Sequence, residues 1–418
     1  MFKKRGEVKE YTGFFGRYRA LIATTTLIGT IVGAGILAIP YVVAKAGFLY
    51  GAFLIISLGI VLMFVNLFMG EVVLRTKQQH QLTGYAEKYL GKNGKKIMAF
   101  SLLFLIYGAL TAYLIGEGES LFQIFKGIFE CGLTEQGDSL LWGFVCSPLL
   151  YSLLFFLVTF IIIYQGVKAT GKAELFLISA LLVIIALVGI FSFDQISWSN
   201  FTGTNWAYFF LPYGVIFFAL HGTAAVPELQ EVLGKEKKQM KKVIVWGSVI
   251  PIILYIVFCF FIIGIIGLQN FELLQPNERI ATIALSFYSS PILGFLANMI
   301  AVLAMFTSYL TLGIALLEVY EYDYHLSKAK AFFLVFSVPL FVVLFNLTSF
   351  ITIIGMTGAI AGGLDGILIT LMYWKAKQLG NRKPEYSLNL PRIVGLMVIV
   401  FFSLGIAYQL WAIFFKSL

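Results

Sequence analysis

The amino-acid sequence predicts an all-α integral membrane protein, and three observations lead to this fold class. Hydrophobic residues make up 60% of the 418-residue chain and charged residues only 12%, a composition far from that of a soluble domain. Apolar runs of roughly 20 residues, the length needed to cross a hydrocarbon core of about 30 Å, recur along the whole chain. The basic residues gather in every second loop between these runs, which is typical of a protein that crosses a membrane many times.

Eleven apolar runs qualify as membrane-spanning helices. In chain order they are residues 20–43, 48–74, 97–115, 148–164, 175–193, 208–229, 243–268, 292–317, 331–345, 349–373 and 393–415. The ninth run is short and contains Pro339, which a helix interior tolerates poorly. If the ninth run did not span the membrane, every later loop would change sides, so the loop charges decide whether it is real.

The loop charges support eleven crossings with the N-terminus in the cytoplasm. In that arrangement 26 of the 30 lysines and arginines lie on the cytoplasmic side, as the positive-inside rule requires. The C-terminus is then extracytoplasmic, and the chain is a multi-pass protein of the cell membrane. The net charge of +9 therefore reflects topology. A nucleic-acid partner is not expected, because the basic residues are divided among short loops and form no single patch.

The chain divides into a cytoplasmic N-terminal segment at residues 1–19, a ten-helix core at 20–373, and a loop with the eleventh helix at 374–418. The N-terminal segment is basic and has no cleavage site after a short apolar region, so we expect a retained anchor. Cys131 and Cys146 share the outer loop between the third and fourth runs, where disulfides can form. Their spacing leaves a disulfide and two free thiols as open alternatives.

Two of the predicted helices are interrupted near the middle of the membrane. The first contains GTIVGAGILAIP at residues 29–40, although glycine costs about 1 kcal/mol and proline about 3 kcal/mol in a helix interior. The sixth contains HGT at residues 221–223. Each break begins about 20 Å from the membrane surface at which its helix enters, so the two breaks approach the midplane from opposite sides.

Each broken helix is the first helix of one half of the core, and the two halves are residues 20–193 and 208–373. Each half has five crossings, an odd number, so the second half must enter the membrane inverted relative to the first. Inverted repeats with paired glycine-interrupted helices are typical of secondary transporters, in which the breaks mark the binding site. Unwound backbone at membrane depth is tolerated only where protein, water or ligand satisfies it. We therefore expect a binding site where the breaks meet.

The stretch GTIVGAGILAIPYVVAKAGFLYG at residues 29–51 resembles the amino acid/auxin permease group and the hydroxy/aromatic amino acid permeases of the amino acid–polyamine–organocation superfamily. Similar stretches follow in the same order, namely GEVVLRT at 70–76, EKYLGKNGK at 87–95, HG at 221–222 and WGSVIPIILY at 246–255. The resemblance implies the leucine-transporter fold, a five-plus-five inverted repeat with helices 1 and 6 broken, plus an eleventh helix. It also implies uptake of neutral or aromatic amino acids, coupled to protons or sodium.

An amino acid is a zwitterion, and the two breaks offer a subsite for each of its charges. In the first helix, backbone amides and the positive end of a helix dipole suit the carboxylate. This subsite comprises Gly33, Ala34 and Gly35. In the sixth helix, exposed carbonyls suit the ammonium group, and these belong to Phe218, Ala219 and Leu220. The alternative role of the glycines is close helix packing of the small-residue type.

Several ionisable side chains lie within or beside the crossings. His221, the one histidine within a crossing, either carries the coupling proton or contacts the substrate, or it holds the break as a neutral group. Asp365 either carries a proton or forms a gate, or it pairs with a lysine of a cytoplasmic loop. Glu71 lies at the inner end of the second run, where an interfacial ion pair is expected. Glu117 and Glu119 lie at the outer end of the third run, where we expect acids to face the vestibule.

Sodium is the alternative coupling ion. The eighth run contains AMFTSYL, in which Ala304, Thr307 and Ser308 have the spacing of the sodium site of the fold that the sequence resembles. By the same resemblance, the carbonyls of Gly29 and Val32 complete the site. Hydroxyls and carbonyls are suitable ligands for a hard cation, whereas Ser and Thr in helices often bond back to their own backbone. The sequence thus leaves proton and sodium both open.

Selectivity for the substrate side chain is expected from residues on three helices. They are Tyr107, Thr111, Phe217, Thr223 and Tyr309. In a chain with 16% aromatic residues, such side chains can equally belong to the core. The sequence has no Walker-type phosphate loop, no HExxH motif and no Cys/His cluster with metal spacing, so neither an enzyme nor a bound cofactor is expected.

These observations predict an amino acid symporter embedded in the lipid bilayer. The rival interpretation is an amino-acid-sensing membrane receptor of the same fold, which binds its ligand without transporting it. A receptor is disfavoured because the chain has no recognisable signalling domain. Neither interpretation determines the oligomeric state.

Overall fold

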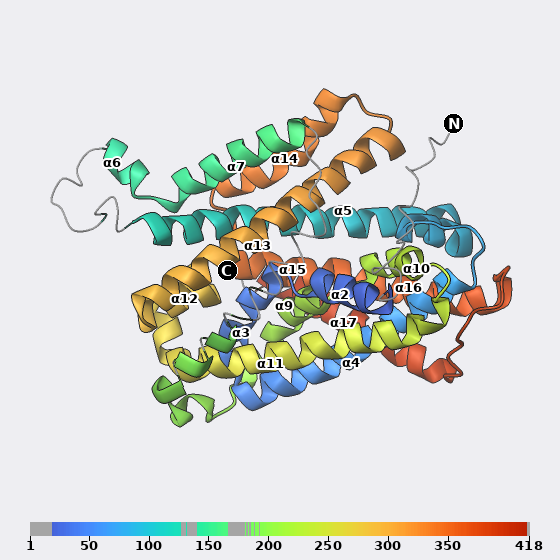
Figure 1. The fold of residues 1–418 in the computed structure, drawn as a ribbon, viewed down its shortest axis with the longest axis horizontal. Coiled ribbons are helices and arrows are strands. Elements are labelled where there is room, and N and C mark those ends of the chain that lie inside the picture. The colour runs from blue at the N-terminus through green and yellow to red at the C-terminus, as the bar shows by residue number, and fades with distance from the viewer. Residues whose placement is uncertain are drawn as a thin grey trace.

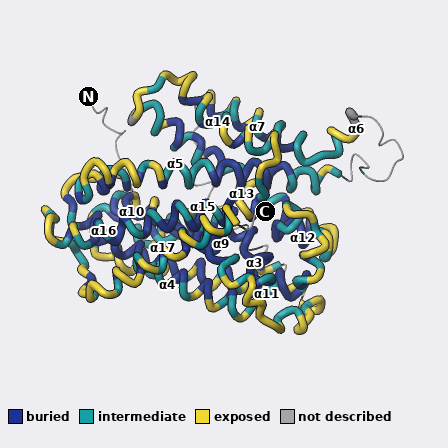
Figure 2. The backbone as a smooth tube through the Cα atoms, turned by 180° about the vertical axis from the view of Figure 1, so that it is seen from behind, coloured by how far each residue is buried: buried dark blue, intermediate teal, exposed yellow. Residues whose placement is uncertain are grey.

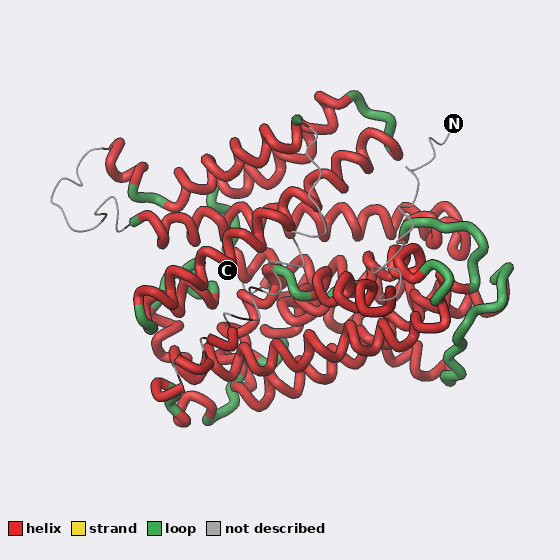
Figure 3. The backbone as a smooth tube through the Cα atoms, in the orientation of Figure 1, coloured by secondary structure: helices red, strands yellow, loops and turns green. Residues whose placement is uncertain are grey.

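The computed structural model describes residues 19–126, 131, 140–165, 180, 183, 185–187, 189–191 and 193–415. Within these residues every regular element is a helix, as Figure 3 shows, which confirms the predicted all-α class. The N-terminal segment predicted to be cytoplasmic, apart from Arg19, and most of the fifth predicted crossing lie outside the described residues.

The helices fall into two groups in chain order. The first group is α2 (Arg19–Ile31), η1 (Ala34–Ala38), α3 (Ile39–Ala46), α4 (Phe48–Leu74), α5 (Leu82–Phe125), α6 (Leu140–Val145) and α7 (Pro148–Tyr164). Three short 3₁₀ segments connect the groups, η3 (Phe193–Gln195), η4 (Trp198–Phe201) and η5 (Trp206–Tyr208). The second group is α9 (Leu211–Leu220), η6 (Thr223–Ala225), α10 (Val226–Leu233), η7 (Lys237–Gln239), α11 (Met240–Leu273), α12 (Ala281–Tyr288), α13 (Pro291–Glu318), η8 (Val319–Asp323), α14 (Lys328–Leu344), α15 (Phe350–Thr357), η9 (Gly358–Gly362), α16 (Gly363–Leu379) and α17 (Arg392–Phe415).

Six of the described helices are long and apolar enough to cross a membrane, and a seventh span results if α2 and the bent continuation η1–α3 are taken together. The apolar helices α7 and α14 have 17 residues each, and α9 and α10 form a second interrupted helix. The predicted total of eleven crossings stays a prediction, because the fifth lies largely outside the described residues.

The two broken helices lie in the middle of the bundle (Figure 1). α4 and α11 pack together on one side of them, α5 lies on the other side, and α7 and α14 cover the far face of α5. Figure 2 shows that buried backbone runs through the middle of the molecule and that exposed backbone lies at its periphery. Large apolar side chains are exposed there, as expected of surfaces that face lipid. Examples are Leu49, Phe53, Ile253 and Phe333.

The bundle has two chemically distinct ends. We call one the basic end, because Arg75, Lys377 and Arg382 follow or end the helices there. We call the opposite end the disulfide end, because a disulfide joins Cys131 and Cys146 there, with their Cα atoms 5.6 Å apart. The long helix α5 runs from the basic end to the disulfide end (Figure 1).

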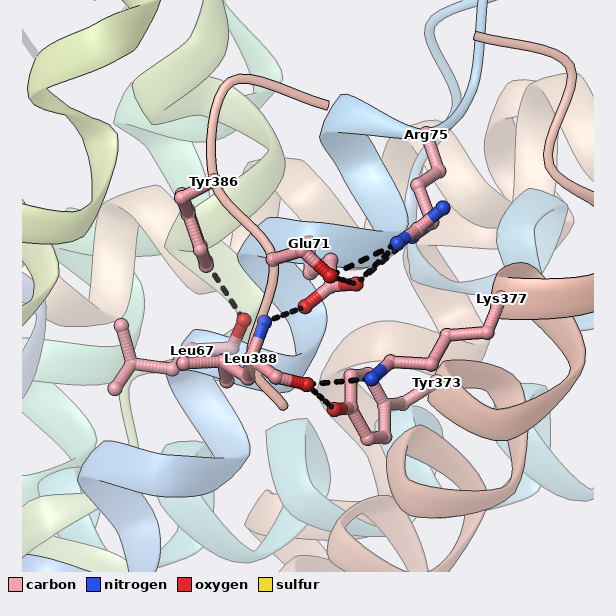
Figure 4. A network of polar contacts seen from close by, with 8 residues as sticks. Leu67, Glu71, Arg75, Tyr373, Lys377, Tyr386 and Leu388 are labelled. Carbon is pink, nitrogen blue, oxygen red and sulfur yellow. Dashed lines mark hydrogen bonds and ion pairs between the residues drawn. The ribbon is translucent and has the colours of Figure 1, made fainter. Parts of the chain in front are cut away.

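At the basic end, the loop after α16 is attached to α4 around the buried carboxylate of Glu71 (Figure 4). This carboxylate accepts hydrogen bonds from Arg75 Nε at 2.8 Å, Ser387 Oγ at 3.0 Å and the Leu388 amide at 2.6 Å. Tyr386 donates to the Leu67 carbonyl at 2.7 Å. Burial, reinforced by the nearby Glu71 carboxylate, raises the pKa of Tyr386 well above its usual value, so this hydroxyl remains a donor. The ion pair expected at Glu71 is present, but the Glu71 carboxylate is buried beneath the loop after α16, which is distant from Glu71 in the sequence.

Candidate functional site

Broken helix 1 turns at Gly33. α2 ends at Ile31, and the chain resumes as η1 at Ala34 after a bend of 40° between the two halves. Gly33 has an extended backbone (φ −106°, ψ −159°), and its amide donates to the Ile31 carbonyl at 2.9 Å. The first amides of η1 have no preceding helical turn to which they can donate. Such amides are suitable ligands for a carboxylate.

Broken helix 6 turns at His221 and Gly222. α9 ends at Leu220, His221 is extended (φ −74°, ψ 113°), and the helix resumes through η6 into α10. The His221 amide donates to the Phe218 carbonyl at 3.2 Å. The last carbonyls of α9 therefore lack the full set of helical partners that an uninterrupted helix supplies.

The two breaks are in direct contact, as expected from the sequence. A Cβ placed on Gly35 would lie 2.7 Å from Ala219 Cα and 2.9 Å from Ala219 Cβ. A methyl group does not fit between them, so this glycine lets the two broken helices touch. The missing side chain of Gly35 thus serves helix packing, while its backbone amide is not involved in that contact.

Gly33 differs from Gly35. A Cβ on Gly33 would have one neighbour within 4 Å, the Tyr113 hydroxyl oxygen at 3.9 Å. Tyr113 lies on α5 and is buried, with 6% of its surface exposed. The space beside the Gly33 amide is therefore faced by a phenol that the sequence analysis did not single out. The sequence of α5 gives no signal for this phenol, because the helix carries several tyrosines and many small residues on all of its faces.

The second site feature is a buried cluster of polar side chains beside the break in helix 6. His221 Nε2 lies 3.4 Å from Asp365 Oδ2 and 3.0 Å from Thr223 Oγ1. Asp365 is fully buried on α16, and 9% of the His221 surface is exposed. Among the described residues, neither oxygen of Asp365 has a hydrogen-bond partner. Two residues expected separately as proton carriers are thus brought together, and no loop lysine of the described chain pairs with Asp365.

This cluster can hold a proton between two groups. A buried ionised carboxylate without donors is costly, and an imidazolium or a proton on the carboxyl itself removes that cost. The His221–Asp365 pair is neutral overall when it holds one proton and carries a negative charge when it holds none. A neighbouring helix supports this region, because Ser101 Oγ donates to the Ala361 carbonyl of the π-helical segment η9 at 2.7 Å.

A third feature escaped the sequence analysis. Tyr255, on α11, is fully buried. Its hydroxyl lies 2.7 Å from the Ile31 carbonyl and 2.9 Å from the Ala219 carbonyl, so it reaches one carbonyl of each broken helix. The one sequence feature that could have indicated this role is the hydroxyl of Tyr255, a single polar atom in the otherwise aliphatic run IPIILYIV.

The residues expected to select the substrate side chain do not all gather at the breaks. The Tyr107 hydroxyl lies 2.7 Å from the Tyr320 hydroxyl and donates to the Leu334 carbonyl at 3.0 Å, so it joins α5 to α14. Tyr309 packs against Phe155 of α7, with ring centroids 5.0 Å apart. Both rings serve packing on the side of α5 that faces α7 and α14.

The remaining selectivity candidates are closer to the breaks. Phe217 is fully buried, and its ring packs against Phe402 of α17 with centroids 5.0 Å apart, so it belongs to the core. Phe218 Cδ1 would lie 3.2 Å from a Cβ on Gly35. Thr111 donates to the Tyr107 carbonyl of its own helix at 2.8 Å, and Thr223 belongs to the histidine cluster.

The sodium candidates on α13 have the ordinary helical pattern. Thr307 Oγ1 donates to the carbonyls of Ala304 at 3.1 Å and Leu303 at 3.3 Å. This back-bonding is the alternative that the sequence left open. Ala304, Thr307 and Ser308 are partly buried, and the structure gives no hydrogen bond that joins them to the described backbone at Gly29 or Val32.

Comparison with known proteins agrees with this geometry. The tryptophan/tyrosine permease family matches residues 17–411. The chain is 26% identical to tyrosine-specific transport system 1 of Haemophilus influenzae over 90% of this chain and 93% of the relative. It is 22% identical to the low affinity tryptophan permease of Proteus vulgaris over 94% of each chain. It is also 24% identical to glutamine transporter 2 of Aliivibrio fischeri, over 80% of this chain and 83% of the relative.

A solved structure with the same fold is that of MhsT in complex with L-phenylalanine. It is 16% identical in sequence and has a TM-score of 0.66, covering 95% of this chain and 98% of MhsT. This likeness confirms the predicted leucine-transporter-like fold. The matched family consists of permeases, which confirms that the protein is an amino acid transporter and not an enzyme. The chain belongs to the tryptophan/tyrosine permease family.

Proposed function

We propose that this permease is a proton-coupled symporter that brings aromatic amino acids into the cell. Relatives are named for tyrosine and for tryptophan transport, which supports an aromatic substrate. The observation that carries the coupling proposal is the buried His221–Asp365 pair, which lies at the break of helix 6 and has no other described partner for its carboxylate.

The substrate lies between the two breaks. The amides of Ala34 and Gly35 bind its carboxylate next to Gly33, with the Tyr113 hydroxyl facing the same space. The end of α9 supplies acceptors for its ammonium group. These acceptors are the carbonyls of Phe218, Ala219 and Leu220. The Phe218 ring, next to the contact between the two helices, is the aromatic group best placed to pack on the substrate side chain.

The coupling proton resides on the His221–Asp365 pair. When the pair holds one proton it has no net charge, so it avoids the free-energy cost of an isolated buried carboxylate. Opening of the pathway toward the cytoplasm hydrates the carboxylate and permits the proton to leave. Proton release is thereby linked to the same movement that releases the substrate. Sodium at Gly29, Val32, Ala304, Thr307 and Ser308 is the other coupling scheme, and the test below separates the two.

The membrane orientation follows from the loop charges. The basic end faces the cytoplasm together with the N-terminus, and the disulfide end and the C-terminus face outward. Residues 20–193 and 208–373 are then two inverted repeats, and substrate passes from the disulfide end to the basic end.

The test is uptake of labelled tryptophan and tyrosine into proteoliposomes with an imposed pH gradient, with and without sodium. We expect accumulation above equilibrium that depends on the pH gradient and not on sodium. Asp365→Asn should abolish this accumulation but retain exchange of internal for external substrate, because exchange needs no net proton movement. The matched control is Glu117→Gln, a second fully buried acid, on α5, whose carboxylate has no hydrogen bond to the breaks among the described residues.

Three outcomes would contradict the proposal in different ways. Accumulation driven by sodium alone would indicate that coupling depends on a sodium site at Thr307 and Ser308. Undiminished accumulation by Asp365→Asn would remove the histidine cluster from the mechanism. Binding of aromatic amino acids without uptake under either gradient would favour the receptor interpretation.

A further inference from the structure

We propose that the Tyr255 hydroxyl is a latch that holds α2, the basic-end half of broken helix 1, against broken helix 6 and releases it when the permease opens toward the basic end. The inference rests on the proposed transport function for its place in the cycle. Its geometric basis is the position of Tyr255 Oη, 2.7 Å from the Ile31 carbonyl and 2.9 Å from the Ala219 carbonyl.

One hydroxyl serves two carbonyls in this arrangement. A phenol has a single proton to donate, so Ile31 and Ala219 share one donor at the ends of their helices. Tyr255 itself is fully buried on α11, a helix that packs along α2, α3 and α4. If α2 moves away, the proton passes entirely to the Ala219 carbonyl, and the hydroxyl remains satisfied. Separation of the two broken helices therefore leaves no unpaired donor behind.

Between Thr24 and Ile31, the contacts that the structure gives between α2 and its neighbours are apolar, apart from the bond to Tyr255. All four threonines of α2 donate to carbonyls of their own helix, so these hydroxyls do not tie α2 to its neighbours. They are Thr24, Thr25, Thr26 and Thr30. On the packed face, Leu27 and Ile31 lie against two glycines. A Cβ on Gly247 would be 2.7 Å from the Leu27 side chain, and a Cβ on Gly222 would be 2.6 Å from that of Ile31.

The other half of broken helix 1 is held quite differently. On α3, Lys45 Nζ lies 2.9 Å from Glu272 Oε1 at the end of α11. Arg279 donates to the Tyr41 hydroxyl at 3.0 Å and lies over the same ring at 4.9 Å. Charged and aromatic groups thus fasten α3 at the disulfide end. Tyr255 and apolar packing hold the end of α2 next to the break, and Arg19, at the other end of α2, lies against Gly234, which follows α10. This asymmetry makes the break end of α2 easier to displace than α3.

The test measures the fraction of molecules in which α2 has moved away from its buried position. Leu27→Cys, in a Cys259→Ala background, puts a thiol on the fully buried face of α2. The rate of its reaction with N-ethylmaleimide reports the exposed fraction. Adding Tyr255→Phe removes the hydroxyl and keeps the ring. We expect the reaction rate to rise about twofold, because release of α2 breaks only the Ile31 share of one hydrogen bond, roughly half of ~1 kcal/mol.

The matched control is Tyr373→Phe, which also deletes a buried hydroxyl bonded to a carbonyl. Tyr373 donates to Leu388 at 2.7 Å at the basic end, away from the breaks. We expect no change in the labelling rate of Leu27→Cys in this variant. An equal increase in both variants would show general loosening and would overturn the latch.

Two further results would also overturn it. One is an unchanged labelling rate in Tyr255→Phe. The other is failure of Tyr255→Phe to insert into the membrane while Tyr373→Phe inserts normally. If the Tyr255 hydrogen bond is required for the bundle to assemble, it cannot be a bond that breaks in every transport cycle.

Transport kinetics separate the latch from the proposed function. A population shifted toward the open basic end leaves fewer molecules able to bind substrate from the opposite side. Tyr255→Phe should therefore raise the KM for external substrate by a similar factor, with the maximal rate preserved. If neither the variants nor the unmodified protein transport aromatic amino acids, the proposed function fails, but the labelling result still decides the latch.

Discussion

The contact between the broken helices gives the sharpest prediction, which concerns Gly35→Ala. The added Cβ would lie 2.7 Å from Ala219 Cα and 2.9 Å from Ala219 Cβ. Carbon atoms pack at about 3.5–4.0 Å, so the overlap is about 1 Å. Because one of these atoms belongs to the backbone, it cannot rotate away, and the two broken helices must separate. Overpacking of this kind costs about 1–3 kcal/mol.

Gly33→Ala is the matched variant, with the same chemical change two residues earlier. Its Cβ would have only the Tyr113 hydroxyl oxygen nearby, at 3.9 Å, so the methyl group fits without moving a helix. It would instead occupy the space beside the amides that we assign to the substrate carboxylate. We expect normal stability and a KM raised on the order of tenfold, which is about 1.4 kcal/mol of binding.

The assay combines thermal stability of the purified protein in detergent with the KM for labelled tryptophan in proteoliposomes. Gly35→Ala should melt at a lower temperature than the unmodified protein, whereas Gly33→Ala should melt at the same temperature as the unmodified protein but bind substrate more weakly. Unchanged stability and activity of Gly35→Ala would refute the close contact. An unchanged KM for Gly33→Ala would refute the carboxylate subsite.

Three further predictions concern residues away from the breaks. Glu117→Gln should keep or raise thermal stability at an unchanged KM, because a fully buried carboxyl whose oxygens have no described partner is costly; a large loss of stability would mean that the acid has an essential partner. Tyr107→Phe should lower stability by ~1 kcal/mol and leave the KM for tryptophan unchanged, since its hydroxyl bonds to α14 and η8; altered selectivity among aromatic amino acids would restore Tyr107 to the site. Glu71→Gln should lower the melting temperature strongly, because breaking a buried pair such as that with Arg75 costs ~3 kcal/mol, and a melting temperature equal to that of the unmodified protein would contradict this.

The breaks could be located from the sequence because glycine and proline act on the backbone at their own positions. The run GTIVGAGILAIP places the first break near Gly33, and the structure bends there by 40°. The pair HG at residues 221–222 marks the end of α9 for the same reason, because Gly222 directly follows His221. The distinction between the two glycines of the first break was not available, because it depends on what lies opposite each one. Ala219 lies opposite Gly35, and open space lies beside Gly33.

The sequence does not determine which tyrosine of a helix faces the breaks, because this depends on helix rotation. Tyr107 and Tyr113 lie on the same helix, α5. The sequence favoured Tyr107, yet the structure turns it toward α14 and turns Tyr113 toward the first break. In a helix that is apolar on nearly all faces, the hydrophobic pattern does not say which face meets the centre.

The sequence alone determined the membrane class, most of the helix boundaries and the two interruptions, because hydrophobicity and backbone preference are local properties of a segment. Only the tertiary structure decided which side chains meet. Asp365 reaches His221 from a different helix, and Tyr255 reaches a carbonyl 224 positions away. Such pairs depend on the rotation and packing of whole helices against one another, and no single segment of the chain records that information.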